Sequence, residues 1–156
     1  MKNVTISLIA CFLLVACQPK TPSEVSEKLV IDSLNAFYAN LDVDSYASKE
    51  WSELVTADFK VFEEGKSMDL NAYLNFTNPS ADLAETNWDL SSFDVLLDNN
   101  TAHVSYINDG FFRHSNLEVT AKWMESALFV LEDGVPKLRF LNANLVDRQV
   151  KKFDSN

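Results

Sequence analysis

Two carboxylates in the second half of the sequence could carry out acid–base chemistry. Glu125 and Asp89 each lie in a segment rich in apolar residues, and a carboxylate kept away from water can be poised as a general base. Tyr106 and Asn142 carry hydrogen-bond donors of the kind that stabilise a developing oxyanion. If the protein is an enzyme, we expect Glu125 or Asp89 to be the base, with Tyr106 as a catalytic donor.

Thiol and imidazole groups are scarce in this sequence. The chain has 2 cysteines and 2 histidines, which is too few for a histidine-rich or thiolate metal site. His103 is expected on the sheet face opposite Tyr106, as a surface or helix-packing residue, and His114 in a loop, without a chemical role. We therefore predict neither a metal nor an organic cofactor.

The start of the chain has the pattern of an export signal. Lys2 precedes an apolar run at 4–15, which is shorter than the ~20 residues that a membrane-spanning helix needs and fits the apolar core of a secretory signal. The run ends in Leu14-Val15-Ala16-Cys17, which resembles the bacterial lipobox. This resemblance implies cleavage after Ala16 and a diacylglyceryl group on the Cys17 thiol.

The lipobox resemblance also implies a location. Several acyl chains hold a protein stably on a membrane, and Gln18 stands where an aspartate would imply retention at the inner membrane. We therefore expect a lipid-anchored protein on the periplasmic face of the outer membrane. Cys11 would leave with the signal, so no free thiol would remain. The alternative is an ordinary cleaved signal followed by a chance cysteine.

Length and charge limit the classes of partner. The chain has 156 residues and a formal net charge of −10, and such an acidic protein repels nucleic-acid phosphates. We expect no nucleic-acid partner. The predicted divisions are a signal peptide at 1–16, a lipidated tether at 17–22, one domain at 23–148 and a polar tail at 149–156.

Helical spacing dominates the first half of the domain. Thr21 and Glu24 form a capping box, and apolar residues at helical intervals predict a helix over 23–41. A second helix is expected to begin near Asp44 and to carry Trp51. Asp69 is expected to cap a short third helix that ends near Asn78 and Pro79.

The second half of the domain changes to the alternating pattern of strands. Strands are predicted at 88–97, 101–108, 117–131 and 136–146, with tight turns at 98–101 and 133–134. Helices followed by consecutive strands predict an α+β domain, in which the N-terminal helices pack on one face of a strongly curved antiparallel sheet.

This order of elements resembles the nuclear transport factor 2-like family, in particular its SnoaL-like branch. The middle strand "NNTAHVSYIN" and the ending Asp133-Gly134 followed by Lys137-Leu138 carry the resemblance. It implies a cone-shaped fold with a ligand pocket. Pro136, Asn142 and Asn144 replace the tryptophan, histidine and serine that are usual at the corresponding places in the family.

Pairing across the two tight turns predicts which residues share the concave face of the sheet. If Leu131 opposes Pro136, then Glu125 faces Asn142, because directly opposed residues lie on one face. The predicted pocket consists of Phe93, Tyr106, Asn108, Trp123, Glu125, Asn142 and Asn144, with its mouth near a loop at 109–116. The alternatives for Glu125 are a water-facing rim or a register slip that turns it outward.

Three functions follow from this pattern. The preferred one is a non-catalytic module that binds a small ligand or a protein partner at the membrane. The alternative is a small cofactor-free enzyme of the isomerase, dehydratase or cyclase kind found in related cones. The third is homodimerisation through the outer face of the sheet, for which the expected apolar residues are Trp88, Leu90, Leu96, Met124, Leu128 and Val130.

Overall fold

A computed structural model describes residues 25–153 of the chain. The predicted tether, and Cys17 with it, lies outside the described residues. The elements in chain order are α1 (Glu27–Ala39), α2 (Trp51–Leu54), β1 (Val55–Glu63), β2 (Lys66–Asp69), α3 (Leu70–Thr77), β3 (Leu83–Leu97), β4 (Thr101–His114), β5 (Leu117–Glu132) and β6 (Val135–Lys152). No helix within the described range is long and apolar enough to cross a membrane.

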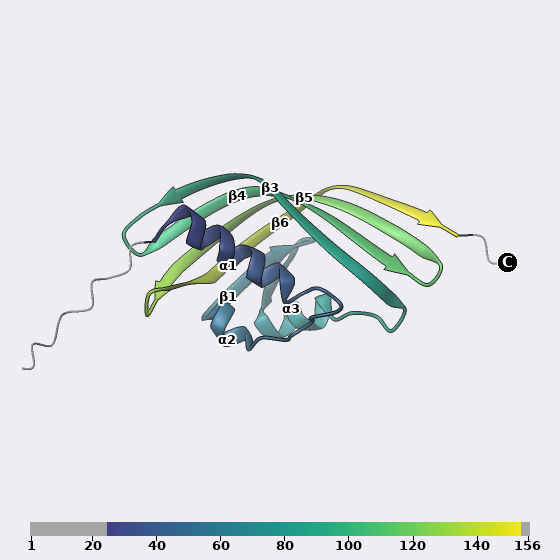
Figure 1. Ribbon diagram of the computed structural model, residues 1–156, viewed down its shortest axis with the longest axis horizontal. Helices are drawn as coiled ribbons and strands as arrows, with labels where there is room; N and C mark the ends of the chain where they lie inside the picture. Colours follow the sequence, from purple (N-terminus) through teal and green to yellow (C-terminus); the bar gives the residue numbers. More distant parts are fainter. Residues whose placement is uncertain (1–24, 154–156) are drawn as a thin grey trace, which may run out of the picture.

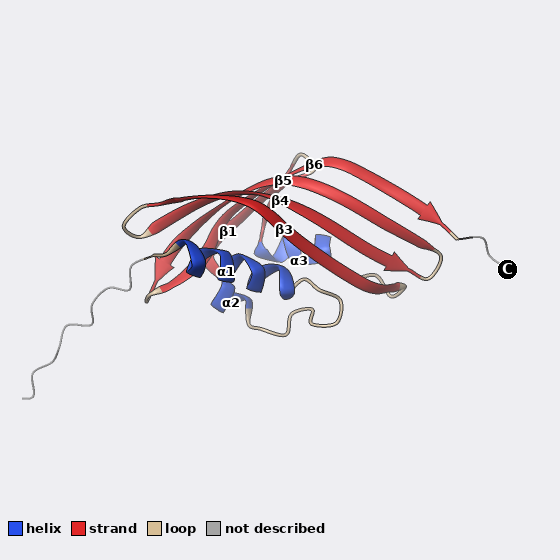
Figure 2. Cartoon of the chain, turned by 45° about the horizontal axis from the view of Figure 1, so that its top comes forward, coloured by secondary structure: helices blue, strands red, loops and turns tan. Residues whose placement is uncertain are grey.

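The predicted α+β architecture is confirmed. The strands form a six-stranded sheet in the order β2-β1-β6-β5-β4-β3, and the helices lie on one side of its long, arching strands (Figures 1 and 2). Neighbouring strands are antiparallel except β1 and β6, which are parallel. The sheet is therefore mixed, and not wholly antiparallel as we expected. The difference arises because β1 pairs in parallel with the free edge of β6, the last strand in the described part of the chain.

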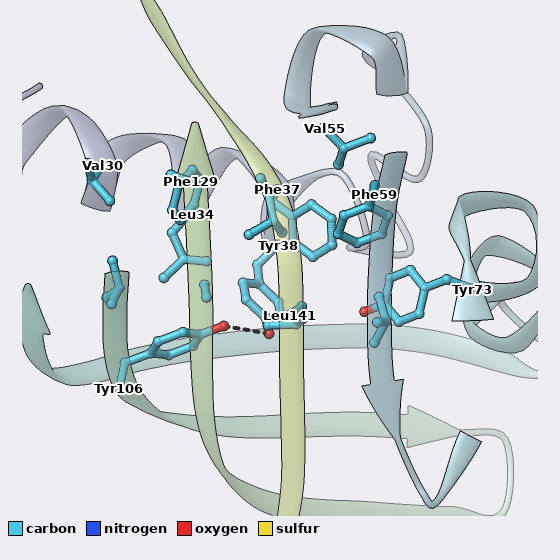
Figure 3. Packing of buried hydrophobic residues seen from close by; sticks show 14 of the residues in the cluster. Val30, Leu34, Phe37, Tyr38, Val55, Phe59, Tyr73, Tyr106, Phe129 and Leu141 are labelled. Atoms are coloured by element: carbon cyan, nitrogen blue, oxygen red, sulfur yellow. Dashed lines mark hydrogen bonds between the residues drawn. The ribbon is translucent and has the colours of Figure 1, made fainter. Parts of the chain in front are cut away.

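Helix α1 supplies the inner layer of the core. It begins after Ser26, whose hydroxyl accepts a hydrogen bond from the Leu29 amide, so the predicted start at 23 was too early. Its buried residues are Val30, Leu34, Phe37 and Tyr38, which recur at the spacing of one helical face. The Phe37 ring contacts Phe59 of β1 and stacks on Tyr73 of α3, with ring centroids 5.9 and 6.1 Å apart (Figure 3).

The second predicted helix is much shorter than expected, whereas the third is confirmed. Residues 40–50 form turns, because buried Asn40 bonds to both the amide and the carbonyl of Lys49 and holds the segment folded back on itself. Only Trp51–Leu54 is helical. Asp69 caps α3 as predicted, accepting a hydrogen bond of 2.9 Å from the Ala72 amide.

The strands run farther than their alternating patterns suggested. The predicted loop at 109–116 is mostly strand, since β4 continues to His114 and pairs along its length with β3 and β5. β6 reaches Lys152 and pairs with β5. Residues 149–152 are therefore strand, although the sequence placed them in a tail.

The hairpin of β3 and β4 contains a bulge that changes which side chains face inward. Pairing beside the turn at 98–101 agrees with the prediction. The register then shifts at Ser92, whose φ is 56°, and Ser91 pairs with Ile107 where Asn108 was expected. A bulge of this kind adds one residue to one strand only.

This bulge overturns the predicted faces for the start of β3. Trp88 and Leu90 were expected on the outer face, but both pack against the hydrophobic core. Asp89 was expected as a candidate base on the concave side, yet it is exposed and pairs with Asp109 on the outer face. The inserted residue exchanges the two faces for every residue beyond it.

A second bulge lies in the hairpin of β5 and β6. Phe129 pairs with Leu138 as predicted, but the register shifts next to Phe129. Glu125 consequently pairs with Ala143 and not with Asn142. The extra residue turns Asn142 and its alternate neighbour Asn144 to the outer face, so neither of them faces Glu125.

Candidate functional site

Glu125 lies at the centre of a buried polar cluster between α1 and the sheet. The residue is 6% exposed. Tyr38 of α1 donates a hydrogen bond to Glu125 Oε2, and the Asn108 amide donates to Oε1 at 3.2 Å. The hydroxyl groups of Tyr38 and Tyr106 lie 3.1 Å apart (Figure 3). The predicted trio of Tyr106, Asn108 and Glu125 is thus brought together.

Burial and hydrogen bonding act in opposite directions on the Glu125 carboxyl. Removal from water raises its pKa, while hydrogen bonds from Tyr106, Tyr38 and Asn108 lower it, and the effect of burial is the largest. Burial and the nearby Glu125 charge raise the pKa of both Tyr38 and Tyr106 well above 10.0. The tyrosines therefore stay protonated as donors, and the carboxyl holds its proton to higher pH than an exposed glutamate does.

A cavity of about 330 Å³ opens beside this cluster on the concave side. Aromatic side chains form part of its wall: the rings of Trp88 and Phe112 are 5.1 Å apart, and those of Trp88 and Trp123 are 6.1 Å apart. Gly110 permits this packing, because a Cβ there would lie 2.8 Å from the Trp123 ring. We call this cavity the aromatic pocket. Its lining residues are Leu41, Glu63, Glu64, Phe76, Thr77, Asn78, Pro79, Ser80, Leu83, Thr86, Trp88, Phe112, His114, Val119, Ala121, Trp123, Leu145 and Arg148.

Trp88 forms the boundary between the aromatic pocket and the buried cluster. It lines the pocket on one side, and on the other its ring centroid lies 5.3 Å from that of Tyr38. Its indole Nε1 is buried and has no hydrogen-bond partner, and the same holds for Asn108 Oδ1. Such unpaired buried groups cost free energy, and an acceptor atom that reached the indole Nε1 of Trp88 would remove that cost.

Glu63 is a second carboxylate at the site, and it was not among the residues predicted from the sequence. It ends β1 and lines the aromatic pocket. Burial, and next the charge of Glu125, raise its pKa from 4.5 to about 7. The signal in the sequence was weak, because Glu63 stands just before the Glu64-Gly65 turn, where an acidic residue is unremarkable. Glu63 reaches the pocket, whereas Glu125 does not line it.

The remaining predicted residues have separate places. Trp123 is a wall of the pocket, as expected. Phe93 stacks on Tyr106 at 6.1 Å and packs against the core outside the pocket. Asn142 and Asn144 line a different groove beside the β1–β2 turn.

The mouth of the pocket partly matches the expectation. Of the predicted mouth residues, Phe112 and His114 line the pocket, but they do so from strand β4. His114 Nδ1 lies 3.2 Å from Asp82, so its imidazole is engaged at the rim. Within residues 25–153, no cluster of three or more histidine, cysteine or acidic side chains has a geometry that could hold a metal ion.

Comparison with known proteins supports the fold alone. No family model and no curated protein matches the sequence. Solved structures do match, among them an NTF2-like protein from Cytophaga hutchinsonii, with a TM-score of 0.64, 12% identity, and coverage of 78% of this chain and 100% of that one. The protein has a nuclear transport factor 2-like fold.

Two further neighbours with this fold have very different descriptions. The CaMKII hub of S. rosetta has a TM-score of 0.61 at 18% identity, covering 83% of this chain and 100% of that one. A hexachlorocyclohexane dehydrochlorinase from Novosphingobium barchaimii has a TM-score of 0.62 at 11% identity, covering 80% and 89%. One NTF2-like scaffold therefore serves both a hub and an enzyme, and fold alone does not select a function.

Proposed function

We propose that this protein is a lipid-anchored envelope protein whose NTF2-like domain binds a small, mostly apolar molecule in the aromatic pocket. The observation that carries the proposal is the buried Nε1 of Trp88, which lacks a partner at the wall of a cavity of about 330 Å³. Ligand pockets typically have volumes of ~300–1,000 Å³, apolar and aromatic walls and a few directed polar groups. The aromatic pocket matches this description.

The walls define the chemistry of the ligand. The rings of Trp88, Phe112 and Trp123 offer contact to a flat apolar body, and Trp88 Nε1 offers one donor to an acceptor atom. Glu63, Glu64 and Arg148 stand among the lining residues and add charge to a wall that also holds several neutral polar side chains. The ligand should therefore be small and largely apolar, with a hydrogen-bond acceptor near one end.

Native mass spectrometry of the full chain purified from its own host tests binding. We expect a small molecule to accompany the wild-type protein and to be lost from Trp88→Phe, which keeps a ring but removes the donor. Trp51→Phe is the matched control, because Trp51 Nε1 is also buried without a partner but does not line the pocket. Unliganded wild-type protein, or equal loss in both variants, would contradict the proposal.

A second function, proton-transfer catalysis, is favoured by Glu63. A general base works best when its pKa lies near the operating pH, and the pKa of Glu63 is raised to about 7 within the pocket wall. The candidate general base is therefore Glu63 and not Glu125, because Trp88 separates Glu125 from the aromatic pocket. The dehydrochlorinase among the structural neighbours shows that an enzyme can have this fold.

Hydrogen exchange into the bound molecule separates catalysis from binding. If Glu63 removes a proton from carbon, the co-purified ligand should gain deuterium when the complex is incubated in heavy water. Glu63→Gln should stop that gain, while Asp94→Asn, at an exposed position on β3, should not. If the ligand binds but gains no deuterium, the proposal of ligand binding stands and the proposal of proton-transfer catalysis fails.

The membrane anchor rests on the sequence around Cys17. The motif Leu14-Val15-Ala16-Cys17 and the polar residues after it support lipidation at the outer membrane. Cys17→Ala should move the protein from the membrane to the soluble fraction of host cells. Mass spectrometry that finds an unmodified Cys17 thiol in the membrane-bound mature chain would overturn the anchor.

A further inference from the structure

The end of β6 presents an open strand edge. β6 has β5 on one edge and β1 on the other. The pairing with β1 reaches only Ala143, whereas the pairing with β5 continues to Lys152. From Asn144 to Lys152, no strand in the described part of the chain covers the outer edge of β6. Figure 1 shows this yellow strand extending beyond the layer of helices. Every residue from 144 to 152 is exposed.

This edge carries apolar side chains that a solitary edge strand would avoid. Leu145, Val146 and Val150 are 39, 51 and 52% exposed, and Phe153 is 38% exposed. A long exposed edge with unpaired amides and carbonyls is a template for pairing with another strand. The segment also contains charged side chains of both signs, so a strand that pairs with it must place opposite charges against them.

We propose that two copies of this chain pair antiparallel along the edge at 147–151, with the two-fold axis at Gln149, and form one continuous sheet. Self-pairing about a two-fold axis places identical surfaces against each other. Gln149 then faces the partner's Gln149, and Asp147 faces the partner's Lys151. The register of β6 against β5 shifts at Val146, so regular pairing is expected only from Asp147 to Lys151. The pairing stops short of Ala143, where β1 occupies the edge.

The charges select this register. A two-fold axis at Asp147, Arg148 or Lys151 would place that residue against its own copy, which opposes like charges. An axis at Val150 would place Arg148 against the partner's Lys152. Like charges directly opposed destabilise a strand pair, and opposite charges stabilise it. Among axes from 147 to 151, only the one at Gln149 opposes no like charges and joins Asp147 to Lys151 twice.

Contacts within the chain favour the same arrangement. Lys151 Nζ already lies 3.6 Å from a carboxylate oxygen of Glu118 on the neighbouring strand β5. Asp147 of the partner subunit would bring a second carboxylate to Lys151 from the opposite, open edge of β6. Asp147 accepts a hydrogen bond of 3.1 Å from Gln149 within the chain. No lysine or arginine forms a salt bridge with Asp147 in the described residues.

Charge reversal in the full chain, purified in detergent and measured by native mass spectrometry, tests the interface. We expect dimers of wild type and monomers of both Asp147→Lys and Lys151→Asp. An equal mixture of the two variants should give a heterodimer, because each lysine of the first chain then opposes an aspartate of the second. Asp94→Lys changes the charge on a strand far from the edge and should leave the dimer intact.

A disulfide provides a second measurement that does not depend on these charges. Directly opposed strand residues have Cα atoms ~4.5–5.5 Å apart, within the range that a disulfide spans. Gln149→Cys should therefore give a covalent dimer under oxidising conditions. Thr120→Cys should not, because Thr120 is exposed and pairs with Gln149 from β5, one strand away from the edge.

Three results would overturn the edge dimer. They are a monomeric wild type with no Gln149→Cys cross-link, dimers that survive both charge reversals, and a mixture that yields no heterodimer. A dimer broken by Met124→Asp but not by the edge variants would place self-association on the outer face of the sheet. These outcomes test self-association and not ligand binding, although Leu145 and Arg148 belong both to this edge segment and to the lining of the aromatic pocket.

Discussion

The hydroxyl of Tyr38 on α1 bonds to Glu125 on β5, so the helix and the sheet are joined by a buried hydrogen bond as well as by apolar packing. The Tyr106 hydroxyl lies next to that of Tyr38, with the two oxygens 3.1 Å apart. The carboxyl is thereby held behind the wall of the aromatic pocket. The cluster fixes Trp88, which packs on the Tyr38 ring at 5.3 Å.

Removal of the Tyr38 hydroxyl should destabilise the fold. Tyr38→Phe leaves the buried Glu125 carboxyl with one donor fewer, and a buried polar group left without its partner typically costs ~1–3 kcal/mol. The free energy of unfolding from urea titration measures the loss. Tyr46→Phe is a control, since the Tyr46 hydroxyl bonds to the Leu74 carbonyl at 3.1 Å in a half-buried position. An effect of Tyr38→Phe no larger than that of the control would show that the cluster adds little stability.

The sequence predicted the architecture because periodicity and turn chemistry are local. Asp69 and the Asp133-Gly134 turn could be assigned from a few neighbouring residues, and both are correct. Trp123 and Tyr106 fell on the concave side for the same reason. The positions of bulges could not be predicted in this way. Where a residue is inserted into a strand depends on how two paired strands curve over the helices, and not on the neighbouring residues alone. No residue next to Ser92 in the sequence indicates that its φ is 56°.

This difference explains which parts of the site were missed. Asn142 and Asn144 were placed opposite Glu125 and Trp123 by counting pairs from the turn, and the count fails past the bulge beside Phe129. Glu63 was missed for another reason. Its environment arises from β1 lying parallel to β6, a contact between distant segments that alternation within each strand does not reveal.

The corrected register makes the two asparagines on β4 and β6 unequal. Asn108 is 1% exposed and donates to Glu125, whereas Asn144 is exposed on the outer face. Asn108→Ala should lower the free energy of unfolding by ~1–3 kcal/mol, because the buried carboxyl loses a donor. Asn144→Ala should change it by less than ~0.5 kcal/mol. Equal effects would favour the register that the sequence alone suggested.

Gly110 should be intolerant of a side chain although its backbone is not strained. A Cβ at this position would lie 2.8 Å from Trp123 and 3.1 Å from Phe112, so Gly110→Ala must displace a pocket wall. Overpacking of this kind costs ~1–3 kcal/mol. Thermal unfolding should show the loss, and tryptophan fluorescence should shift as Trp123 moves. Unchanged melting and emission would mean that the wall is loose enough to accept a methyl group.

Glu63 should make the protein less stable as the pH rises. Its pKa is 4.5 when unperturbed and about 7 in the fold, so the folded state binds the proton more tightly than the unfolded state. The stability that this proton contributes is complete below pH ~4.5 and is lost as the pH rises through ~7. Glu63→Gln should therefore gain stability relative to wild type at pH 8 and show no such gain at pH 4, as measured by urea unfolding.

The link between Glu63 and Glu125 can be measured in the same protein. Burial is the largest cause of the raised Glu63 pKa, and the Glu125 charge is the next. In Glu125→Gln, the carbon-13 NMR titration midpoint of the Glu63 carboxyl should fall from about 7 but remain above 4.5. A midpoint that does not move would show that Glu125 carries no charge near neutral pH, since a neutral carboxyl exerts no Coulomb force. A fall all the way to 4.5 would contradict the burial of Glu63, and with it the case for a base in the pocket wall.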